Sequence, residues 1–289
     1  MCATTSIQTQ FVLTLTDAAP LVVAVVASLL VAVAAWRLGG LTKSGAAAAT
    51  LVGACALLVS VGVGTFLVCW FALATVLSRI GKQRKTQRLR GIVEKGGQRD
   101  ARQVLANGGV FCLVLFGVLV SGAGCDLTTR CGYLMLVAAA GSLAAAGADT
   151  WATEIGTMLG GRPYAVRTGE RVPAGTSGAV TLPGSLAMVV GAFTLAVLAA
   201  LCTVIPFEVR SVAAVAIGGT LGSVADTVIG AWFQERRRCP SCATLTEQLV
   251  HECGATTVRY SGVAGMNNDA VNAGCALVGA LGAVFTVLL

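Results

Sequence analysis

The sequence predicts an all-α protein, a polytopic integral membrane bundle of about eight transmembrane helices. Hydrophobic residues make up 56% of the 289 positions and charged residues only 11%, whereas soluble domains average about 25% charge. The apolar residues form continuous runs, long enough for a helix to cross roughly 30 Å of hydrocarbon. They lack the alternation of barrel strands. Lysine and arginine concentrate in every second loop between the runs, which is typical of a membrane protein with a fixed orientation.

Eight apolar runs define the expected helices. Their boundaries fall at roughly 18–36, 44–62, 65–80, 108–124, 131–157, 182–205, 210–233 and 272–289. The 36 glycines suit close helix packing in lipid, where small residues let backbones approach. No basic segment precedes the first run, so a cleaved signal peptide is not expected. Residues 18–289 are predicted to form one transmembrane domain after a short non-cytoplasmic tail, residues 1–17.

The basic residues predict the orientation of this bundle. Loops after the first, third, fifth and seventh runs hold 18 of the 20 lysines and arginines, while Arg130 and Arg210 alone lie on the opposite side. The positive-inside rule makes the basic loops cytoplasmic and leaves both termini non-cytoplasmic. The main cytoplasmic loops are then 81–107, 158–181 and 234–271. The net charge of +7 follows from this topology and from attraction to anionic lipid, so no nucleic-acid partner is expected.

Three carboxylates fall inside predicted spans, where each costs roughly 2.5–3.5 kcal/mol on insertion scales and usually faces a cavity, a partner or a metal. They are Asp149, Glu154 and Asp226. Segments 141–156 and 219–234 share small residues leading into Ala-Asp-Thr, which indicates an internal repeat that matches Asp149 with Asp226. On a straight helix Asp149 and Glu154 point about 140° apart, so a joint site needs a kink or the second helix. We expect these three residues to be catalytic ligands of magnesium.

Phosphate-binding features surround the same end of the bundle. Several predicted helices begin there with polar motifs, and helix N-termini offer free amides and a positive dipole end. The sequence RVPAGTSGAVTLPG, residues 171–184, supplies glycines that let backbone amides approach a ligand. The expected phosphate ligands here are Arg162, Arg167, Arg171, Gly175, Thr176, Ser177 and Gly178. The same motifs also suit ordinary turns and helix caps. A phosphate-binding loop ending in Gly-Lys-Ser/Thr is missing, which excludes a P-loop nucleotidase.

Cysteines form two further patterns. The segment CPSCATLTEQLVHEC brings Cys239, Cys242, His251 and Cys253 within fifteen positions. Such a set can close a four-ligand structural zinc site, although the short second spacing also fits a loop with free thiols. On the opposite side, Cys125 and Cys131 flank a longer loop, and their spacing permits a disulfide if that compartment is oxidising.

The order of motifs resembles one membrane family. GLTKSGAAAATLVG, RQVLANGG, ADTWATEIG, VPAGTSGAVTLPG, GSVADTVIGAWFQ, CPSC with HECG, and MNNDAVN follow one another from about residue 38 to the C-terminus. This order is similar to the family of transmembrane protein 19, which also contains the plant phytyl-phosphate kinase of tocopherol synthesis. The resemblance implies an all-helical membrane fold. It also implies that Asn107, Asn268 and Asn272 belong to the site as phosphate or nucleotide ligands.

The leading functional hypothesis from the sequence is a membrane-embedded phosphotransferase. It would act on an isoprenoid, phytyl-like monophosphate with a nucleoside triphosphate and magnesium, and its partner would otherwise be the lipid bilayer. Phosphoryl transfer relies on positioning and charge neutralisation, so the chemistry needs no protein nucleophile. Two alternatives remain: a membrane transporter with an acidic relay near the midplane, and a membrane protein without enzymatic activity.

Overall fold

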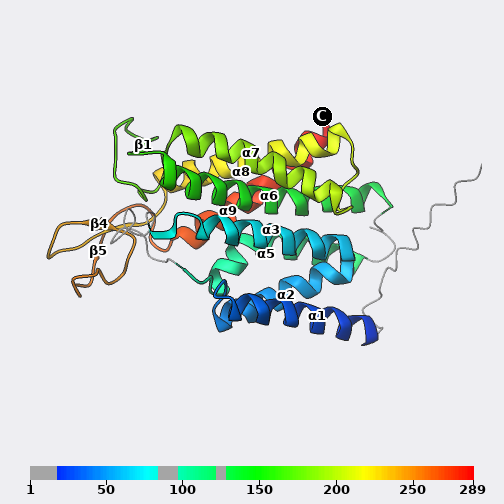
Figure 1. Ribbon diagram of the computed structural model, residues 1–289. Coiled ribbons are helices and arrows are strands. Elements are labelled where there is room, and N and C mark those ends of the chain that lie inside the picture. Colours follow the sequence, from blue (N-terminus) through cyan, green and yellow to red (C-terminus); the bar gives the residue numbers. More distant parts are fainter. Residues whose placement is uncertain (1–17, 84–96, 122–127) are drawn as a thin grey trace, which may run out of the picture.

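The helices lie side by side in one elongated bundle, seen in the computed structural model of Figure 1, which describes residues 18–83, 97–121 and 128–289. Within these residues the helices are α1 (Ala18–Arg37), α2 (Lys43–Val59), α3 (Val61–Arg79), α5 (Ala101–Ser121), α6 (Arg130–Leu159), α7 (Leu182–Leu201), α8 (Val209–Trp232) and α9 (Asn268–Leu288). The predicted tail 1–17, part of the loop 81–107, and Cys125 lie outside the described residues. Cys131 is disulfide-bonded.

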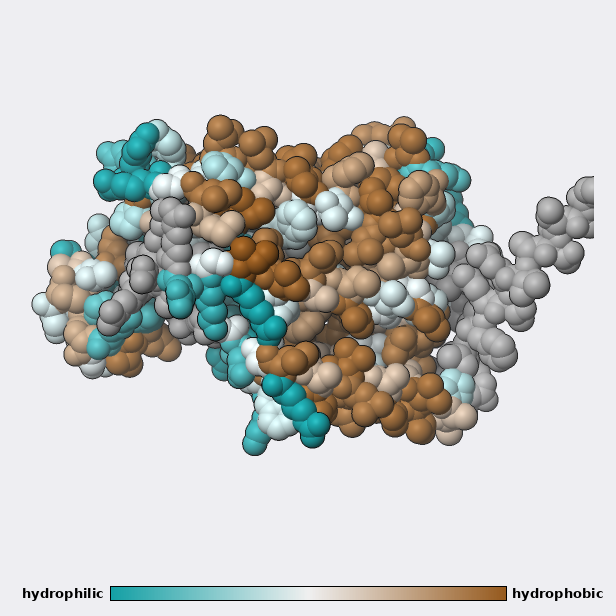
Figure 2. Space-filling model, in the orientation of Figure 1, coloured by the Kyte–Doolittle hydropathy of each residue, from teal (hydrophilic) through white to brown (hydrophobic). Residues whose placement is uncertain are grey.

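The all-α membrane fold is confirmed. In the described part of the chain, seven helices are long and apolar enough to cross a membrane. The remaining one, α2, has 17 residues and would span about 25 Å at 1.5 Å per residue. On the face drawn in Figure 2, hydrophobic residues cover most of the helical body, and hydrophilic residues are most prominent toward the end that carries the strands. The protein is therefore an integral, multi-pass membrane protein whose immediate environment is the bilayer.

Short strands and loops cover one end of the bundle, here called the strand end (Figure 1). It holds the connections 38–42, 97–100, 160–181 and 233–267. A two-stranded sheet pairs β1 (Tyr164–Ala165) with β2 (Ala179–Val180), and a three-stranded sheet has the order β4 (Leu245–Thr246), β3 (Arg236–Arg238), β5 (Val258–Ser261). The C-terminus lies at the opposite end. The loops predicted to share one side of the membrane are thus together.

Helix starts follow the capping rule that the sequence predicts. The residue before a helix accepts a hydrogen bond from the amide three positions later, which satisfies one of the free N–H groups of the first turn. This arrangement occurs at Thr42, Ser60, Thr129, Thr181 and Asn267. At Asp100 and Gln103 the bond is reciprocal, because each side chain accepts the other residue's amide.

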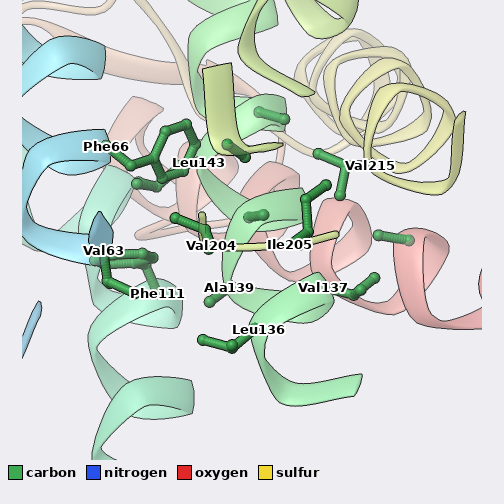
Figure 3. Packing of buried hydrophobic residues seen from close by; sticks show 14 of the residues in the cluster. Val63, Phe66, Phe111, Leu136, Val137, Ala139, Leu143, Val204, Ile205 and Val215 are labelled. Atoms are coloured by element: carbon green, nitrogen blue, oxygen red, sulfur yellow. The ribbon is translucent and has the colours of Figure 1, made fainter. Parts of the chain in front are cut away.

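The main core surrounds α6. Figure 3 shows buried side chains of α3, α5, α6 and the α7–α8 connection converging in one cluster, including Phe66, Phe111 and Leu143. The other face of α6 is built from alanine and glycine and meets α8 and α9. Without a hydrophobic force between helices in lipid, this face depends on close backbone packing. That close packing positions the candidate site.

Candidate functional site

The positions of Asp149 and Asp226 follow from a contact between two small residues, Ala145 and Gly222. A β-carbon added at Gly222 of α8 would overlap Cβ of Ala145 of α6 and would lie 2.6 Å from the carbonyl oxygen of Cys275. Four residues further along each helix, about one turn, stand Asp149 and Asp226. Both helices run toward the strand end, so the two aspartates face each other, and their charges interact. The structure therefore brings these two predicted carboxylates together.

The predicted repeat has a packing role. In both helices the same four-residue step leads from two small residues to the aspartate: Gly141, Ala145, Asp149 and Gly218, Gly222, Asp226. A β-carbon at Gly141 would come within 2.6 Å of Cβ of Ala283, and one at Gly218 within 2.7 Å of the same atom. Both copies of the repeat therefore pack against α9 at Ala283. Each copy needs small residues at these positions to come that close.

One oxygen of the pair lacks a partner. Within the described residues, Oδ2 of Asp226 is buried and makes no hydrogen bond. A buried carboxylate oxygen without a partner is costly. A hard cation is a ligand that would remove this cost, because magnesium prefers carboxylate oxygens.

A third carboxylate reaches the pair from the hairpin at 233–267. Glu247 follows β4, and its charge interacts with that of Asp226. Its Oε1 accepts hydrogen bonds from Ser177 Oγ at 2.6 Å and from Gln234 Nε2 at 2.8 Å. Arg236 donates to the carbonyl of Ser177 at 2.7 Å. The hairpin, the loop before α7 and the end of α8 are thus joined above the aspartates.

The predicted glycine-rich loop packs against α8. A β-carbon at Gly178, whose φ is +70°, would lie 2.5 Å from the amide nitrogen of Ala231. Gly175 also has a positive φ, +86°. Among hydrogen bonds between described residues, the amides of Gly175, Ser177 and Gly178 donate none. Backbone amides in such a turn can serve as anion donors.

Glu154 is held apart from the aspartates. As the straight-helix geometry predicts, it lies on another side of α6, where its charge interacts with Arg99. Arg99 donates to Thr75 Oγ1 at 3.2 Å and stacks over Phe71 at 5.3 Å. Burial lowers the pKa of Arg99 from its usual value, and the charge of Glu154 opposes that shift. Within the described residues, Asp149, Glu154 and Asp226 do not form a three-ligand metal group.

The predicted arginines separate in the structure. Arg162 is exposed. Arg171 stacks over the ring of Tyr164 at 5.1 Å and donates to its hydroxyl. Arg167 lies near Arg236, since the two charges interact; burial and then this repulsion lower the pKa of Arg236. A cluster of two guanidinium groups beside the glycine-rich loop is suited to an anion.

The predicted asparagines lie in the first two turns of α5 and α9. Asn107 donates to the carbonyl of Gln103 in α5. Asn268 is exposed, whereas its neighbour Asn267 caps α9. Asn272 is half-buried and precedes Cys275 by three positions, so the two share a face of α9. The charges of Asp149 and Asp226 both act on Cys275, which places Asn272 on the α9 face nearest the pair.

Four polar residues were not predicted from the sequence: Gln234, Arg236 and Glu247 of the network above the aspartates, and Arg99 beside Glu154. They lie in charged or cysteine-rich loops, and only the folding of those loops brings them to the spans. One signal was available for Arg99, because the capping pair Asp100 and Gln103 marks the start of a helix. A residue just before a helix start at a polar membrane face is a reasonable site candidate.

The cysteine–histidine group comes together in the structure. The ligand atoms of Cys239, Cys242, His251 and Cys253 all lie within 4.8 Å of one another. Among the described residues, these four side chains form the group of three or more His, Cys, Asp or Glu residues whose ligand atoms are close enough to hold one metal ion. A hydrogen bond from His251 lowers the pKa of Cys253 to about 6, which favours the thiolate. The set fits a tetrahedral metal site.

Fold and site together define a multi-pass helical membrane protein in which two equivalent helices, α6 and α8, each carry an aspartate near the strand end. The chain belongs to the family described as integral membrane protein DUF92, which matches residues 26–280. This confirms the resemblance to the family of transmembrane protein 19.

Curated relatives include two proteins of one plant and one protein of an archaeon. Protein PGR of Arabidopsis thaliana is 26% identical over 270 residues, covering 87% of this chain and 91% of that protein. Protein VTE6, chloroplastic, of the same plant is 29% identical over 201 residues, covering 68% of this chain and 57% of its own length. An uncharacterized membrane protein, MJ0933, of Methanocaldococcus jannaschii is 32% identical over 173 residues, 59% of this chain and 64% of that protein. No solved structure matches the chain.

Proposed function

We propose that the protein is a membrane-embedded phosphotransferase that acts on an isoprenoid monophosphate. An oxygen of the acceptor phosphate would attack the terminal phosphorus of a nucleoside triphosphate. The bond to the bridging oxygen would break, giving an isoprenoid diphosphate and a nucleoside diphosphate. The observation that carries the proposal is the interaction of Asp149 with Asp226 beneath the glycine-rich loop: among the described residues, one buried oxygen of Asp226 and three amides of that loop have no hydrogen-bond partner. Family membership supports it, because the plant phytyl-phosphate kinase belongs to the same family.

Asp149 and Asp226 are the residues that would hold magnesium. The unpaired Oδ2 of Asp226 is the observation that fits a cation there. When bound, magnesium would neutralise charge on the phosphate oxygens. Glu154 has a different part in this proposal: next to Arg99, it fixes the connection before α5 against α6.

The nucleotide phosphates have suitable donors directly above the pair. The amides of Gly175, Ser177 and Gly178 make no other hydrogen bond to described residues, and Arg167 and Arg236 lie nearby. Glu247 would hold this loop in place through Ser177. Positioning of this kind contributes much of the catalysis in phosphoryl transfer.

The lipid tail would lie on the same face of α6. An apolar groove of about 270 Å³ lies between α5, α6 and α9. Its lining residues on α6 include Cys131 and Ala138. Ala138 precedes Asp149 by eleven positions, which is about 16 Å along the axis and returns to nearly the same face. An isoprenoid whose phosphate lies at Asp149 would point its tail toward this groove.

The test is transfer of label in a purified system. Protein in lipid nanodiscs is supplied with phytyl phosphate, magnesium and either CTP or ATP labelled in the terminal phosphate. The expected result is label in phytyl diphosphate, with a loss of at least about 100-fold in rate for Asp226→Asn, as expected when a ligand of a charge-neutralising metal is removed. Glu208→Gln is the matched control, since Glu208 is an exposed carboxylate at the opposite end. Absence of label with either nucleotide and several isoprenoid phosphates would overturn the proposal.

A further inference from the structure

The hairpin at 233–267 contains a cluster that phosphoryl transfer does not use. Sγ of Cys239 lies 3.4 Å from Sγ of Cys253, Sγ of Cys242 lies 3.4 Å from Nδ1 of His251, and that nitrogen lies 3.2 Å from Sγ of Cys253. Zinc with thiolate bonds near 2.3 Å and imidazole bonds near 2.0 Å holds neighbouring ligand atoms about 3.5–3.8 Å apart. The observed separations are close to those of a tetrahedral site.

The backbone forms two similar turns around the cluster. Cys239 accepts from the amide of Ala243 and donates to Thr244. His251 accepts from the amide of Gly254 and donates to Ala255. Ala243 and Gly254 each follow the last cysteine of their turn, and both have a positive φ, +58° and +85°.

The conformation of Ala243 is costly for a residue with a side chain. A left-handed conformation costs roughly 1–2 kcal/mol for such a residue and persists where the surroundings enforce it. A shared ligand at the centre of both turns would enforce this one. A disulfide between Cys239 and Cys253 would leave the other two side chains without a role.

Metal binding would act on the segment between the two turns. Residues 243–250 connect Cys242 with His251 and contain Glu247, whose carboxylate accepts from Ser177 and Gln234. This segment has little apolar packing, since Leu245 and Leu249 are exposed. Its two ends converge on the cluster, so a bound ion would close it into a fixed loop.

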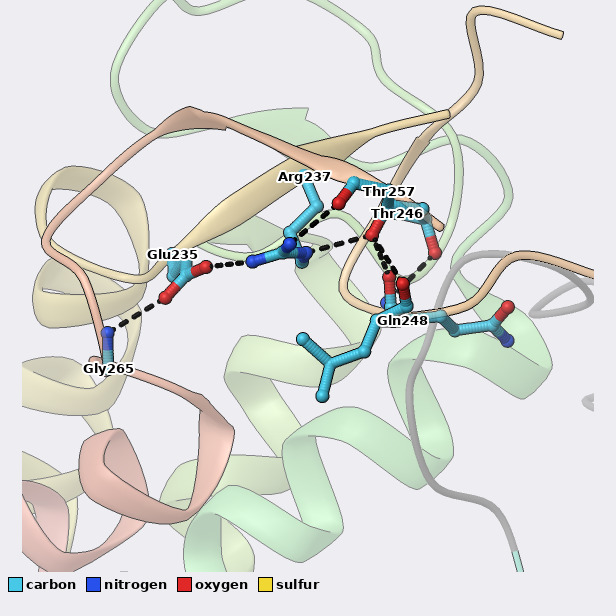
Figure 4. Close-up of polar contacts among 7 residues, drawn as sticks. Glu235, Arg237, Thr246, Gln248, Thr257 and Gly265 are labelled. Atoms are coloured by element: carbon cyan, nitrogen blue, oxygen red, sulfur yellow. Dashed lines mark hydrogen bonds and ion pairs between the residues drawn. The ribbon is translucent and has the colours of Figure 1, made fainter. Parts of the chain in front are cut away.

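The base of the hairpin is held by a separate polar network (Figure 4). Arg237 forms an ion pair with Glu235, which also accepts from the amide of Gly265 at 2.8 Å. Arg237 donates to Thr257 Oγ1 at 2.8 Å, and Thr257 donates to the carbonyl of Gln248 at 2.6 Å. These contacts fix the strands, whereas the tip of the hairpin depends on the cysteine–histidine cluster.

We infer that Cys239, Cys242, His251 and Cys253 bind one Zn²⁺ through three thiolates and Nδ1, and that the ion holds the Glu247 segment over the Asp149–Asp226 pair. The zinc is structural, because all four positions are filled by protein ligands. This inference does not depend on the proposed phosphotransferase activity.

The test measures metal and loop order instead of activity. Elemental analysis of the purified full chain should find about one zinc per protein, falling to about a tenth or less in Cys242→Ser and in Cys253→Ser. Cys69→Ser, which changes a free cysteine in α3, should retain the metal. Treatment of the unaltered protein with a zinc chelator should speed cleavage by a glutamate-specific protease after Glu247 and Glu252, which lie in and beside the segment between the two turns, and added zinc should restore protection.

Cobalt gives a second readout if a serine variant fails to fold. Cobalt added to the chelator-treated protein should produce the absorption of a tetrahedral thiolate site. Zinc-free protein from cells grown with ample zinc, or zinc that survives in Cys253→Ser, would overturn the inference. Equal cleavage after Glu247 and Glu252 before and after chelation would also contradict the role given to the ion. A negative phosphotransferase assay would leave these results unaffected.

Discussion

The hydroxyl of Ser177, in the loop before α7, donates a 2.6 Å hydrogen bond to the carboxylate of Glu247, in the hairpin after α8. Two loops far apart in the sequence are thereby joined directly above the ends of α6 and α8. Arg236 adds a second link by donating to the carbonyl of the same serine. Anything that lifts the glycine-rich loop from α8 should therefore disturb both loops.

Gly178→Ala should weaken nucleotide binding. The added β-carbon would lie 2.5 Å from the amide nitrogen of Ala231, so the loop must move away from α8. A displacement of about 1 Å can cost roughly 10- to 100-fold, which we expect as a rise in KM for the nucleotide in the phosphotransfer assay. Gly169→Ala is the control, since Gly169 also has a positive φ, +69°, but no atom of the described residues lies within 4 Å of its β-carbon position. Equal effects of the two substitutions would attribute the loss to backbone strain alone and contradict the packing explanation.

Gly222→Ala should destabilise the bundle and separate the two aspartates. The new methyl group would meet Ala145, the carbonyl of Cys275 and the backbone of Gly279 from two other helices. Overpacking of this kind costs roughly 1–3 kcal/mol. Thermal denaturation in detergent should show a melting temperature lower by several degrees. Gly109, in α5, has no neighbour within 4 Å of its β-carbon position in the described part of the chain, so Gly109→Ala should be neutral or slightly stabilising because alanine favours helix. A Gly222→Ala protein as stable as the Gly109→Ala protein would refute the close packing.

Arg99→Met should loosen the attachment of α5 to α3 and α6. It removes the hydrogen bond to Thr75, the stacking on Phe71 and the charge opposite Glu154. Hydrogen bonds to charged groups contribute roughly 1.5–3 kcal/mol, so the melting temperature should fall clearly. Arg102→Met changes an exposed arginine one turn later and should have little effect. The prediction fails if both variants melt alike.

Ala138→Leu should lower activity on a long isoprenoid phosphate but not on a short one. A larger side chain would fill the apolar groove between α5, α6 and α9. We expect kcat/KM for phytyl phosphate to fall about tenfold, since each methylene in an apolar pocket is worth roughly 1–3 kcal/mol. Activity on the short isopentenyl phosphate should be unchanged. Ala72→Leu, on the exposed surface of α3, should alter neither. An equal loss of activity with both lipids would contradict binding of the tail in this groove.

Much of this architecture could be predicted because hydropathy determines membrane spans. The run predicted at 131–157 is the helix Arg130–Leu159, and the described parts of the basic loops predicted to share one side lie at one end. The pairing of Asp149 with Asp226 was also accessible, since a repeated small-residue step before each aspartate encodes equivalent helix contacts.

The polar network at the strand end could not be predicted in the same way. Glu247 and Arg236 lie in a loop whose course depends on tertiary contacts, and no local pattern marks either as a neighbour of Asp226. Glu154 was grouped with the aspartates by composition, although helical geometry already indicated a different face. Side-chain direction thus carries information that residue type and span membership do not.

The most direct test of a shared site formed by the two repeats is binding of Mn²⁺, used as a probe for magnesium. Electron paramagnetic resonance of the purified protein with a non-hydrolysable nucleotide should reveal one bound Mn²⁺. Either Asp149→Asn or Asp226→Asn should abolish that same signal, whereas Glu208→Gln should preserve it. A bound ion that remains when either aspartate is replaced would show that the two carboxylates do not serve one site.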